Sequence, residues 1–451
     1  MFALISLTGV FSVTLGKSLG PESSDRSVAG SILNTKSSSI SWSRTYLSEI
    51  GPESVQVTTD GGFVLAGLSF GPWVMKADIA GEPEWSRYYS PMGYSTTCCS
   101  GIDSIGQTSD GGYVVAGYAG FSTGPSDAWL FKLGANGDVQ WSKTYRGPQR
   151  GEEFFRAQQT FDGGYVAVGN TASFGYPPGH LSNGWVLKLD KNGNIVWQEA
   201  FGGQDISSID QTRDGGFVVA GTVGVDNRAD AWIFKLDREG NVVWQKAYEA
   251  STRTDAYSIQ QTRDGGYIVA GHSSLGALIL RLDRKGNILW QKTENGSGFT
   301  THSVSETSDG GFIVSGRSDL GPFLLKLNAK GGTVWQTVYG VPNNFLYQVQ
   351  ETMNGGLIVA GSLATNCCGD QGWVLKLDGN GGISGCSIAG FATGIITSAT
   401  SVVTSVQVLG VSTRAAVTDT SVAVTMAPIY LSTQCVSVQD RTQNGRGHLR
   451  V

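Results

Sequence analysis

Residues that could carry out catalysis are few in this 451-residue chain, and their spacing suits no common reaction. Neither a zinc-binding H-E-x-x-H motif nor a serine nucleophile motif is present. Glu306 and Glu351 could form a general acid/base pair. They occupy positions where other repeats carry Gln, so a Glu-for-Gln exchange on a solvated wall explains them more simply. The sequence therefore favours a non-catalytic protein, and we expect neither a cofactor nor a metal. The four histidines are scattered: His180, His272, His302 and His448.

The cysteines indicate disulfide chemistry rather than metal binding. An even number in an apparently exported chain favours disulfides. We expect Cys386 to pair with Cys435, because these two residues bracket the C-terminal tail. The adjacent pairs either cross-link to one another or form vicinal disulfides, since structural zinc sites need a spacing such as C-x-x-C. The six residues are two adjacent pairs and two single cysteines: Cys98, Cys99, Cys367, Cys368, Cys386 and Cys435.

Ligand-binding side chains are expected in four long loops, at residues 120–128, 170–184, 222–231 and 362–372. Loops on a rigid scaffold commonly carry recognition, and aromatic rings beside polar groups suit a glycan or a peptide. Loop length that drifts without constraint is the alternative, because no spacing among these residues is diagnostic. The candidates are Phe121, Phe174, Tyr176, His180, Asp226, Arg228 and Asp230.

A sevenfold repeat must position these residues. Its most regular part is the run TRDGGYIVAG at Thr262, and close copies begin at Thr58, Thr108, Thr160, Thr212, Thr307 and Thr352. The copies are spaced by 50, 52, 52, 50, 45 and 45 residues, a period that indicates a propeller or a solenoid. Each copy contains four short apolar runs bounded by Gly, Asn and Asp, which is typical of strands. We therefore predict an all-β fold, a seven-bladed β-propeller of four-stranded antiparallel blades.

The tryptophans predict how the ring closes. Six repeats carry a Trp in the fourth strand, whereas the last repeat ends without one. The missing copy stands at the front of the chain, at Trp42 in SISWSRTY. We therefore expect the N-terminal strand to complete the last blade and to hide two sheet edges. The other five tryptophans begin third strands, so all twelve are expected to pack in cores.

Loop lengths vary at only two of the four joints of the repeat. The turn between the first and second strands is constant, as from Asp264 to Gly271, and so is the turn between the third and fourth, as from Arg281 to Trp290. In an antiparallel meander the two variable joints share one end of the blade. They define the variable-loop face, which carries the connections between second and third strands and between blades.

Each third strand also carries one basic residue. A ring of cations could bind an anion, but we expect each to pair with a carboxylate of its own blade, such as the Asp before Gly-Gly. The residues are Lys76, Lys132, Lys188, Lys235, Arg281, Lys326 and Lys376.

Composition divides the chain into four parts. Residues 1–38 are a signal-like apolar segment with a linker, and residues 39–385 are the propeller. Residues 386–440 form a β tail rich in Ser, Thr and Val, whose polar residues argue against a transmembrane span, and residues 441–451 are a disordered polar end. The net charge of −5 argues against a nucleic-acid partner. The apolar start at residues 2–15 predicts export, and hence an extracellular or cell-surface location.

The motif DGG-[YF]-[IV]-V-A-G followed by W-[LIV]-x-K-L-D-x-x-G-N-[IV]-x-W-Q-K resembles a propeller repeat of secreted and surface proteins of bacteria and archaea. The resemblance covers about residues 40–385. The G-N-I-x-W element also looks like the Trp-bearing repeat of quinoprotein dehydrogenases. This chain departs from that family in having seven blades instead of eight and in lacking a recognisable set of residues for the cofactor's calcium.

These observations favour an exported non-catalytic propeller for extracellular binding or adhesion, or as a structural subunit of a surface assembly. The expected partners are a protein or a glycan at the variable-loop face, and copies of the chain itself through the C-terminal tail. The alternative is an enzyme on a propeller scaffold, either a quinoprotein-type oxidoreductase or a carbohydrate-active enzyme.

Overall fold

The computed structural model shows an all-β protein. Within the described ranges no helix is long and apolar enough to span a membrane. The description covers residues 41–383, apart from short gaps, and seven short strands between residues 389 and 437. The gaps are 49–50, 69, 95–98, 122–123, 150, 175–182, 203, 226–227, 251, 294–297, 341 and 365–370.

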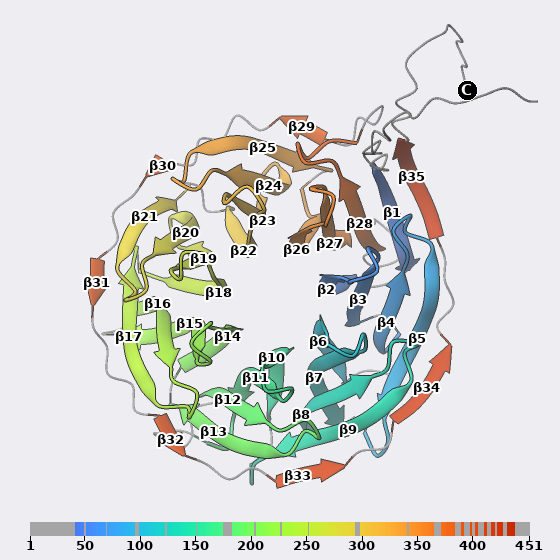
Figure 1. Cartoon of the computed structure of the whole chain (residues 1–451), viewed down its shortest axis with the longest axis vertical. Helices are drawn as coiled ribbons and strands as arrows, with labels where there is room; N and C mark the ends of the chain where they lie inside the picture. Colours follow the sequence, from blue (N-terminus) through green and yellow to red (C-terminus); the bar gives the residue numbers. More distant parts are fainter. Residues whose placement is uncertain are drawn as a thin grey trace, which may run out of the picture. The chain divides into compact units, whose positions relative to one another are not determined.

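Seven antiparallel sheets, the blades, form a ring around a central channel (Figure 1), which confirms the predicted seven-bladed β-propeller. In each blade the first strand lies innermost. Blades one and two contain β2 (Pro52–Val57), β3 (Phe63–Leu68), β4 (Pro72–Ala77) and β5 (Pro83–Pro91), then β6 (Gly101–Gln107), β7 (Tyr113–Phe121), β8 (Gly124–Leu133) and β9 (Val139–Arg146). Blades three and four contain β10 (Glu153–Gln159), β11 (Tyr165–Thr171), β12 (Asn183–Leu189) and β13 (Ile195–Phe201), then β14 (Gln204–Gln211), β15 (Phe217–Val225), β16 (Arg228–Leu236) and β17 (Val242–Glu249).

The remaining blades repeat this arrangement. Blades five and six contain β18 (Thr254–Gln261), β19 (Tyr267–Ser273), β20 (Gly276–Leu282) and β21 (Ile288–Thr293), then β22 (Thr300–Glu306), β23 (Phe312–Ser318), β24 (Gly321–Leu327) and β25 (Thr333–Tyr339). Blade seven contains β26 (Phe345–Glu351), β27 (Leu357–Leu363), β28 (Gln371–Leu377) and, from the start of the chain, β1 (Ser41–Ser48).

The Asp-Gly-Gly turns form the first hairpin of each blade. In blade three, Asp162 Oδ1 accepts hydrogen bonds from the Thr160 hydroxyl at 2.5 Å and from Gly164 N at 3.0 Å. Gly163, between them, has a φ of 79°, a conformation that a residue with a Cβ adopts only with strain. The same residues at the same spacing therefore specify the same turn in each blade.

The N-terminal strand closes the ring, as predicted. β1 pairs with β28, with Trp42 opposite Lys376. Its side chains also reach blade one, where the Tyr46 hydroxyl donates a hydrogen bond to the Gly81 carbonyl at 2.7 Å. The strand thus joins the last blade to the first.

The tail adds a fifth strand to every blade, an arrangement that we call the belt (Figure 1). It pairs with the outer strands of blades six, five, four, three, two and one in that order, against the direction of the chain, and it ends beside β1 in blade seven. The strand donation that we expected between copies is seen here within one chain. The belt strands are β29 (Ala389–Phe391), β30 (Thr397–Ser398), β31 (Val402–Thr404), β32 (Gly410–Ser412), β33 (Ala416–Asp419), β34 (Val422–Met426) and β35 (Leu431–Ser437).

Hydrophobic cores lie between neighbouring blades, and each core draws on two of them. The fourth-strand tryptophan of one blade packs on a turn glycine of the next. A Cβ on Gly193, for example, would lie 3.0 Å from the Trp141 ring. Beside it, the Tyr145 hydroxyl donates to the Gly193 carbonyl at 2.6 Å. These contacts explain why the tryptophans recur, and they confirm that the repeat uses them for packing.

Candidate functional site

The structure does not gather the predicted loop residues into one site. Phe121 ends β7, and its ring lies 4.6 Å from that of Tyr94, whereas the Phe174 ring lies 5.7 Å from that of Trp185 in a core of blade three. Asp230 is fully buried in β16, and Arg228 begins that strand. Tyr176, His180 and Asp226 lie outside the described residues.

Most of the cysteines also lie outside the described residues, namely Cys98, Cys367, Cys368 and Cys386, so the expected disulfides stay predictions. Cys99 lies just before β6, and its carbonyl oxygen packs against Gly120. Cys435 stands in β35, where its backbone is in register with Ser43 of β1.

Glu306 and Glu351 join blades instead of forming an acid/base pair. Glu306 Oε2 accepts a hydrogen bond from Arg263 N at 2.8 Å, and Glu351 Oε1 accepts one from the Ser308 hydroxyl at 2.8 Å. Glutamine makes the equivalent bond elsewhere, as from Ser109 N to Gln159 Oε1 at 2.7 Å. Glu and Gln share the side-chain oxygen that accepts this bond between blades. Gln also donates from Nε2 to a turn carbonyl, as Gln211 does to Gly215 O at 3.3 Å.

The basic residues of the third strands pair with turn carboxylates in six of the seven blades, as predicted. In blade three, Lys188 Nζ lies 2.9 Å from Asp162 Oδ2. Partial burial acts to raise the pKa of Asp162, but hydrogen bonds from Lys188, Thr160 and Gly164 outweigh it and bring the pKa to about 2. Blade seven carries Asn354 at the turn, and there Lys376 Nζ donates instead to the Ile79 carbonyl of blade one at 2.6 Å.

These turn carboxylates predict a loss of stability in acid. Since the folded-state pKa of Asp162 lies below its unfolded value, its contribution is present above about pH 4 and is lost as the pH falls toward 2. The Asp162→Asn variant should therefore show a lower Tm at pH 7 and a smaller fall in Tm between pH 4 and pH 2. The effect should be modest, because the Asp162 side chain is 62% exposed and water screens the pair.

Scanning calorimetry of Asp162→Asn against Asp319→Asn tests this expectation. Asp319 is an exposed carboxylate in the turn between β23 and β24, so its replacement changes the net charge equally without touching a buried lysine. Identical acid profiles for the two variants would show that the ion pair contributes nothing.

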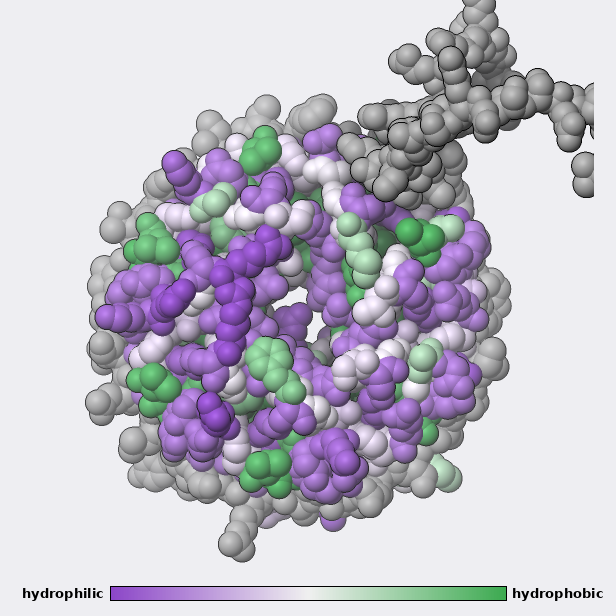
Figure 2. Space-filling view, viewed as in Figure 1, coloured by the Kyte–Doolittle hydropathy of each residue, from purple (hydrophilic) through white to green (hydrophobic). Residues whose placement is uncertain are grey.

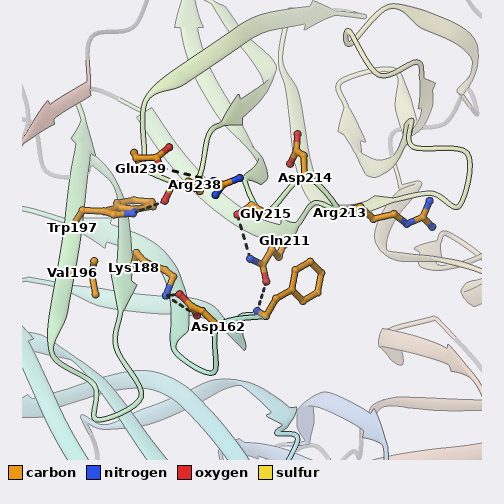
Figure 3. A pocket seen from close by; sticks show the side chains of 11 residues that line it. Asp162, Lys188, Val196, Trp197, Gln211, Arg213, Asp214, Gly215, Arg238 and Glu239 are labelled. Carbon is orange, nitrogen blue, oxygen red and sulfur yellow. Dashed lines mark hydrogen bonds and ion pairs between the residues drawn. The ribbon is translucent and has the colours of Figure 1, made fainter.

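A groove of about 730 Å³ lies between blades three and four (Figure 3). Trp197 lines it and donates to the Arg238 carbonyl at 3.0 Å, while Gln211 Oε1 accepts from Phe161 N at 2.8 Å. A groove of about 430 Å³ lies between blades four and five, where Trp244 and Arg284 correspond to Trp197 and Arg238. Because the groove recurs with the repeat, it follows from how blades pack and marks no specific site.

The central channel carries the feature that distinguishes one blade from another. The innermost strand of every blade has a β-bulge, and the bulged residue stands seven positions before the Asp or Asn of the first turn. A bulge leaves its residue outside the strand pairing and redirects its side chain. These residues lie toward the variable-loop end of the channel. We call them the bulge ring: Glu53, Asp103, Phe155, Ser207, Tyr257, His302 and Tyr347.

The two residues that follow each bulge-ring position hold the blades together. The residue that follows is Ser in five blades, and these hydroxyls accept hydrogen bonds from the innermost strand of the next blade, as Ser104 Oγ does from Ala157 N at 3.3 Å. The residue after that is apolar in all seven blades and packs in a core, as Ile209 does. The framework is therefore repeated while the bulge ring is not.

Five members of the bulge ring line a cavity of about 120 Å³ in the channel: Glu53, Asp103, Phe155, His302 and Tyr347. A second space of about 280 Å³ is lined by residues closer to the first turns, among them Gln158, Asp210 and Gln350. Figure 2 shows an opening at the centre of the ring, surrounded mostly by hydrophilic side chains.

Glu53 and Asp103 form a carboxyl pair between blades one and two. Burial raises the pKa of both groups. The negative charges of Glu53 and Glu153 raise the pKa of Asp103 further, and a hydrogen bond joins the Glu53 and Asp103 side chains. Two carboxyls in such contact share a proton, because both cannot ionise at low cost. Asp103 is therefore the group that keeps a proton longest.

The opposite side of the channel is aromatic. The His302 ring lies 6.4 Å from that of Tyr257 and 6.2 Å from that of Tyr347. Burial, with the nearby charge of Arg317, lowers the pKa of His302 to about 4, so the imidazole is neutral at pH 7. The Arg317 guanidinium lies over the Phe345 ring, 4.7 Å from its centroid. The channel thus combines an acidic wall with an aromatic one.

Arg156 and Asp210, which interact electrostatically, also line the channel. Arg156 donates to the Ser208 hydroxyl at 3.2 Å, and its charge is balanced by Asp210 of the next blade. Burial raises the pKa of Asp210 to about 6, against the opposing effect of Arg156 and of the hydrogen bond from Gln261 N. Among the described residues, no group of three or more His, Cys, Asp or Glu side chains is arranged to hold a metal ion.

Comparisons with known proteins identify no family for this chain. No family model and no curated protein matches the chain. A mutant of puromycin hydrolase complexed with PGG is 12% identical, with a TM-score of 0.49, over 73% of this chain and 52% of that one. Sqt1 from Chaetomium thermophilum is 13% identical, with a TM-score of 0.44, over 70% of this chain and 81% of that one. A protein of unknown function from Dyadobacter fermentans is 12% identical, with a TM-score of 0.43, over 74% and 98%. Similarity at this level carries no argument about function.

Proposed function

We propose that this chain is an exported, non-catalytic β-propeller that binds its ligand at the bulge ring. The observation that carries the proposal is the divergence of one position in an otherwise repeated framework. Six residue types occupy the seven bulge positions, whereas the flanking positions keep the residues that join and pack the blades. A symmetric scaffold with an asymmetric lining is suited to recognising one particular ligand.

The site has the surroundings that recognition requires. The bulge holds each of these residues outside the strand pairing. The residue type can therefore vary to suit a ligand without weakening the sheet. Carboxyls on one wall and rings on the other offer both charge and apolar contact to a polar ligand. The variable loops lie at the same end of the channel, where a protein or a glycan that presents the ligand would dock.

Export is supported by the apolar start at residues 2–15 and by the even number of cysteines. Outside the cell, such a propeller would act in adhesion or as a subunit of a surface assembly. Self-association through the tail would require the belt of one copy to pair with the blades of another. Peptide mapping of the secreted protein without reduction tests this environment, because a free Cys386 and a free Cys435 would contradict it.

A blocking substitution tests the site. Ser207→Trp places an indole in the bulge ring, on a position that the framework does not use. The native protein and this variant are screened against a glycan, peptide and metabolite library, with Phe161→Ala on the exposed first turn of blade three as the control. We expect the bound library member to lose at least tenfold in affinity for Ser207→Trp alone. Equal binding by all three proteins would place the ligand elsewhere.

The carboxyl pair favours one second candidate, a carbohydrate-active enzyme on the same scaffold. Two carboxyls that share a proton can act as a general acid and a general base. If the protein is a hydrolase, it should depolymerise a polysaccharide in a time course that Asp103→Asn abolishes. If a library member is recovered unchanged after incubation with the native protein and with Asp103→Asn, the Glu53–Asp103 pair serves binding and not catalysis.

A further inference from the structure

Two buried polar atoms at the cavity of the bulge ring lack a hydrogen-bond partner among the described residues. They are Asp103 Oδ2 and His302 Nε2, on opposite sides of the channel. A buried polar atom left without a partner costs about 1–3 kcal/mol. A ligand that donates hydrogen bonds to both atoms would recover this free energy, so the two atoms mark where such a ligand sits.

The charge around the cavity selects a cation. Glu53 and Asp103 lie in its wall, and Glu153, whose pKa is raised by burial, stands above them on blade three. Two nearby cations are matched: Arg156 is balanced by Asp210, and Arg253 Nε lies 2.8 Å from Asp255 Oδ2. A third, Arg317, acts on His302 and lies over the Phe345 ring, and the three acidic groups outnumber it. The carboxylates that remain give the cavity a negative potential.

We propose that the bulge ring binds a primary alkylammonium group, whose three N–H donors point to the Glu53 carboxylate, Asp103 Oδ2 and His302 Nε2. The proposal rests on the proposed function and names the class of ligand for the same site. An alkylammonium has three donors and no acceptor. The cavity offers one acceptor for each donor, because a carboxylate only accepts and a neutral imidazole carries one acceptor nitrogen.

Size and ring placement agree with this ligand. A cavity of about 120 Å³ holds an ammonium head and a few attached carbon atoms. Phe155 and Tyr347 line the same space, and aromatic rings near a cation favour its binding. A lysine side chain, a peptide N-terminus and a free diamine all present this chemistry.

Binding should release a proton. The Glu53–Asp103 pair keeps a shared proton in the free protein, because two adjacent carboxylates repel each other. A bound ammonium supplies positive charge and hydrogen bonds that offset this repulsion, so the proton is released. The groups that face the pair are Glu153 and Tyr118, with Arg156 and His302 across the cavity. Of these, Glu153, His302 and the pair itself titrate in the acid range, and His302, whose pKa is about 4, is already neutral at pH 5. Affinity should therefore increase from pH 5 to pH 8.

Isothermal titration calorimetry of the full chain tests the proposal with 1,4-diaminobutane, N-acetyl-lysine amide and alanyl-alanine amide as probes. The three compounds separate a diamine, a lysine side chain and a peptide N-terminus as the source. Titrations in phosphate and in HEPES, neither of which contains a primary amine, report the released proton through the difference in buffer heat. We expect binding of at least one probe, with proton release, and at least a tenfold loss of affinity in Asp103→Asn and in Glu53→Gln.

The controls separate the possible failures. Ser207→Ala, a bulge-ring substitution outside the cavity wall, should bind normally, and 1-butanol should not bind. Tetramethylammonium lacks N–H donors, so equal binding of this cation would overturn the hydrogen-bond assignment. If no probe binds while Ser207→Trp still abolishes binding of another library member, the ammonium proposal fails and the binding site stands. If neither binds, both proposals fail.

Discussion

Replacing Trp42 with Ala should open the ring and cost about 3–5 kcal/mol of stability, the usual range for deleting a buried Trp side chain. Trp42 is fully buried, and its ring lies 5.9 Å from that of Phe63 in blade one. The ring also packs on Gly81, whose φ of 83° leaves the space that the indole occupies. The side chain therefore belongs to the core that joins the last blade to the first.

The closure differs from the other blade contacts in its sequence separation. Elsewhere a blade contacts the next one in the chain, as Tyr145 does Gly193, 48 residues away. At the closure, Trp373 Nε1 donates to the Ser43 hydroxyl at 2.9 Å, across 330 residues. A contact of this kind holds the ends of the chain together, so losing it should destabilise all seven blades at once.

Scanning calorimetry with limited proteolysis measures the effect. The matched control is Trp141→Ala, which removes the same side chain from the same strand position between blades two and three. Trp141 is partly exposed, so its replacement should cost less and leave proteolysis confined to those blades. Tyr46→Phe removes only the hydrogen bond to Gly81 and should cost about 1 kcal/mol. Equal losses in the two Trp variants would show that closure gives Trp42 no special role.

The repeat predicted the blades and their closure because its signals are local. Asp-Gly-Gly turns, apolar strands and one Trp per fourth strand recur at fixed distances, so seven copies support one another. The role of Trp42 was predictable for the same reason. The last repeat lacks a fourth-strand Trp, and Trp42 is the one copy that stands outside the repeats. The pairing of Lys188 with Asp162 likewise follows from positions that every blade shares.

The sequence analysis did not predict the bulge ring, because variable loop length pointed to the four long loops instead. Its signal is present in the sequence: the position seven residues before each turn Asp or Asn carries six residue types, whereas the next position is Ser in five blades and the one after it is always apolar. Recognising it required the strand register, since an extra residue in one strand is visible only against its partner. Phe121, Phe174 and Asp230 were chosen for their loops, and the structure places them on different blades.

The tail sequence predicts extended strands, but it does not predict that each strand pairs with a different blade to form the belt. The strands β29–β35 are two to seven residues long and have no repeat of their own that matches the blades. Their partners are set by pairing across the whole ring and in reverse order. A free sheet edge accepts almost any extended segment through its backbone, so the side chains specify little of the pairing.

Ending the chain at Gly385 should make the propeller associate with further copies of itself through its exposed sheet edges. The truncation removes all seven belt strands and leaves β5, β9, β13, β17, β21, β25 and β1 as edges. Unpaired edges are templates for pairing with other chains. Blade seven should suffer most, because β1 is then held by β28 alone, and β1 carries the closure.

Light scattering after size-exclusion chromatography, together with the Tm, measures this outcome. Each backbone hydrogen bond contributes about 1 kcal/mol net, so losing pairing at seven edges should lower the Tm by well over 10 °C, roughly 2–4 °C for each kcal/mol. A chain ending at position 437 keeps every belt strand and should behave as the full chain does. A chain ending at position 420 lacks only β34 and β35 and should be intermediate, since the edges of blades one and seven alone are exposed. If the chain ending at Gly385 stays monomeric with an unchanged Tm, the four-stranded blades are sufficient by themselves, and the belt has another purpose than protecting their edges.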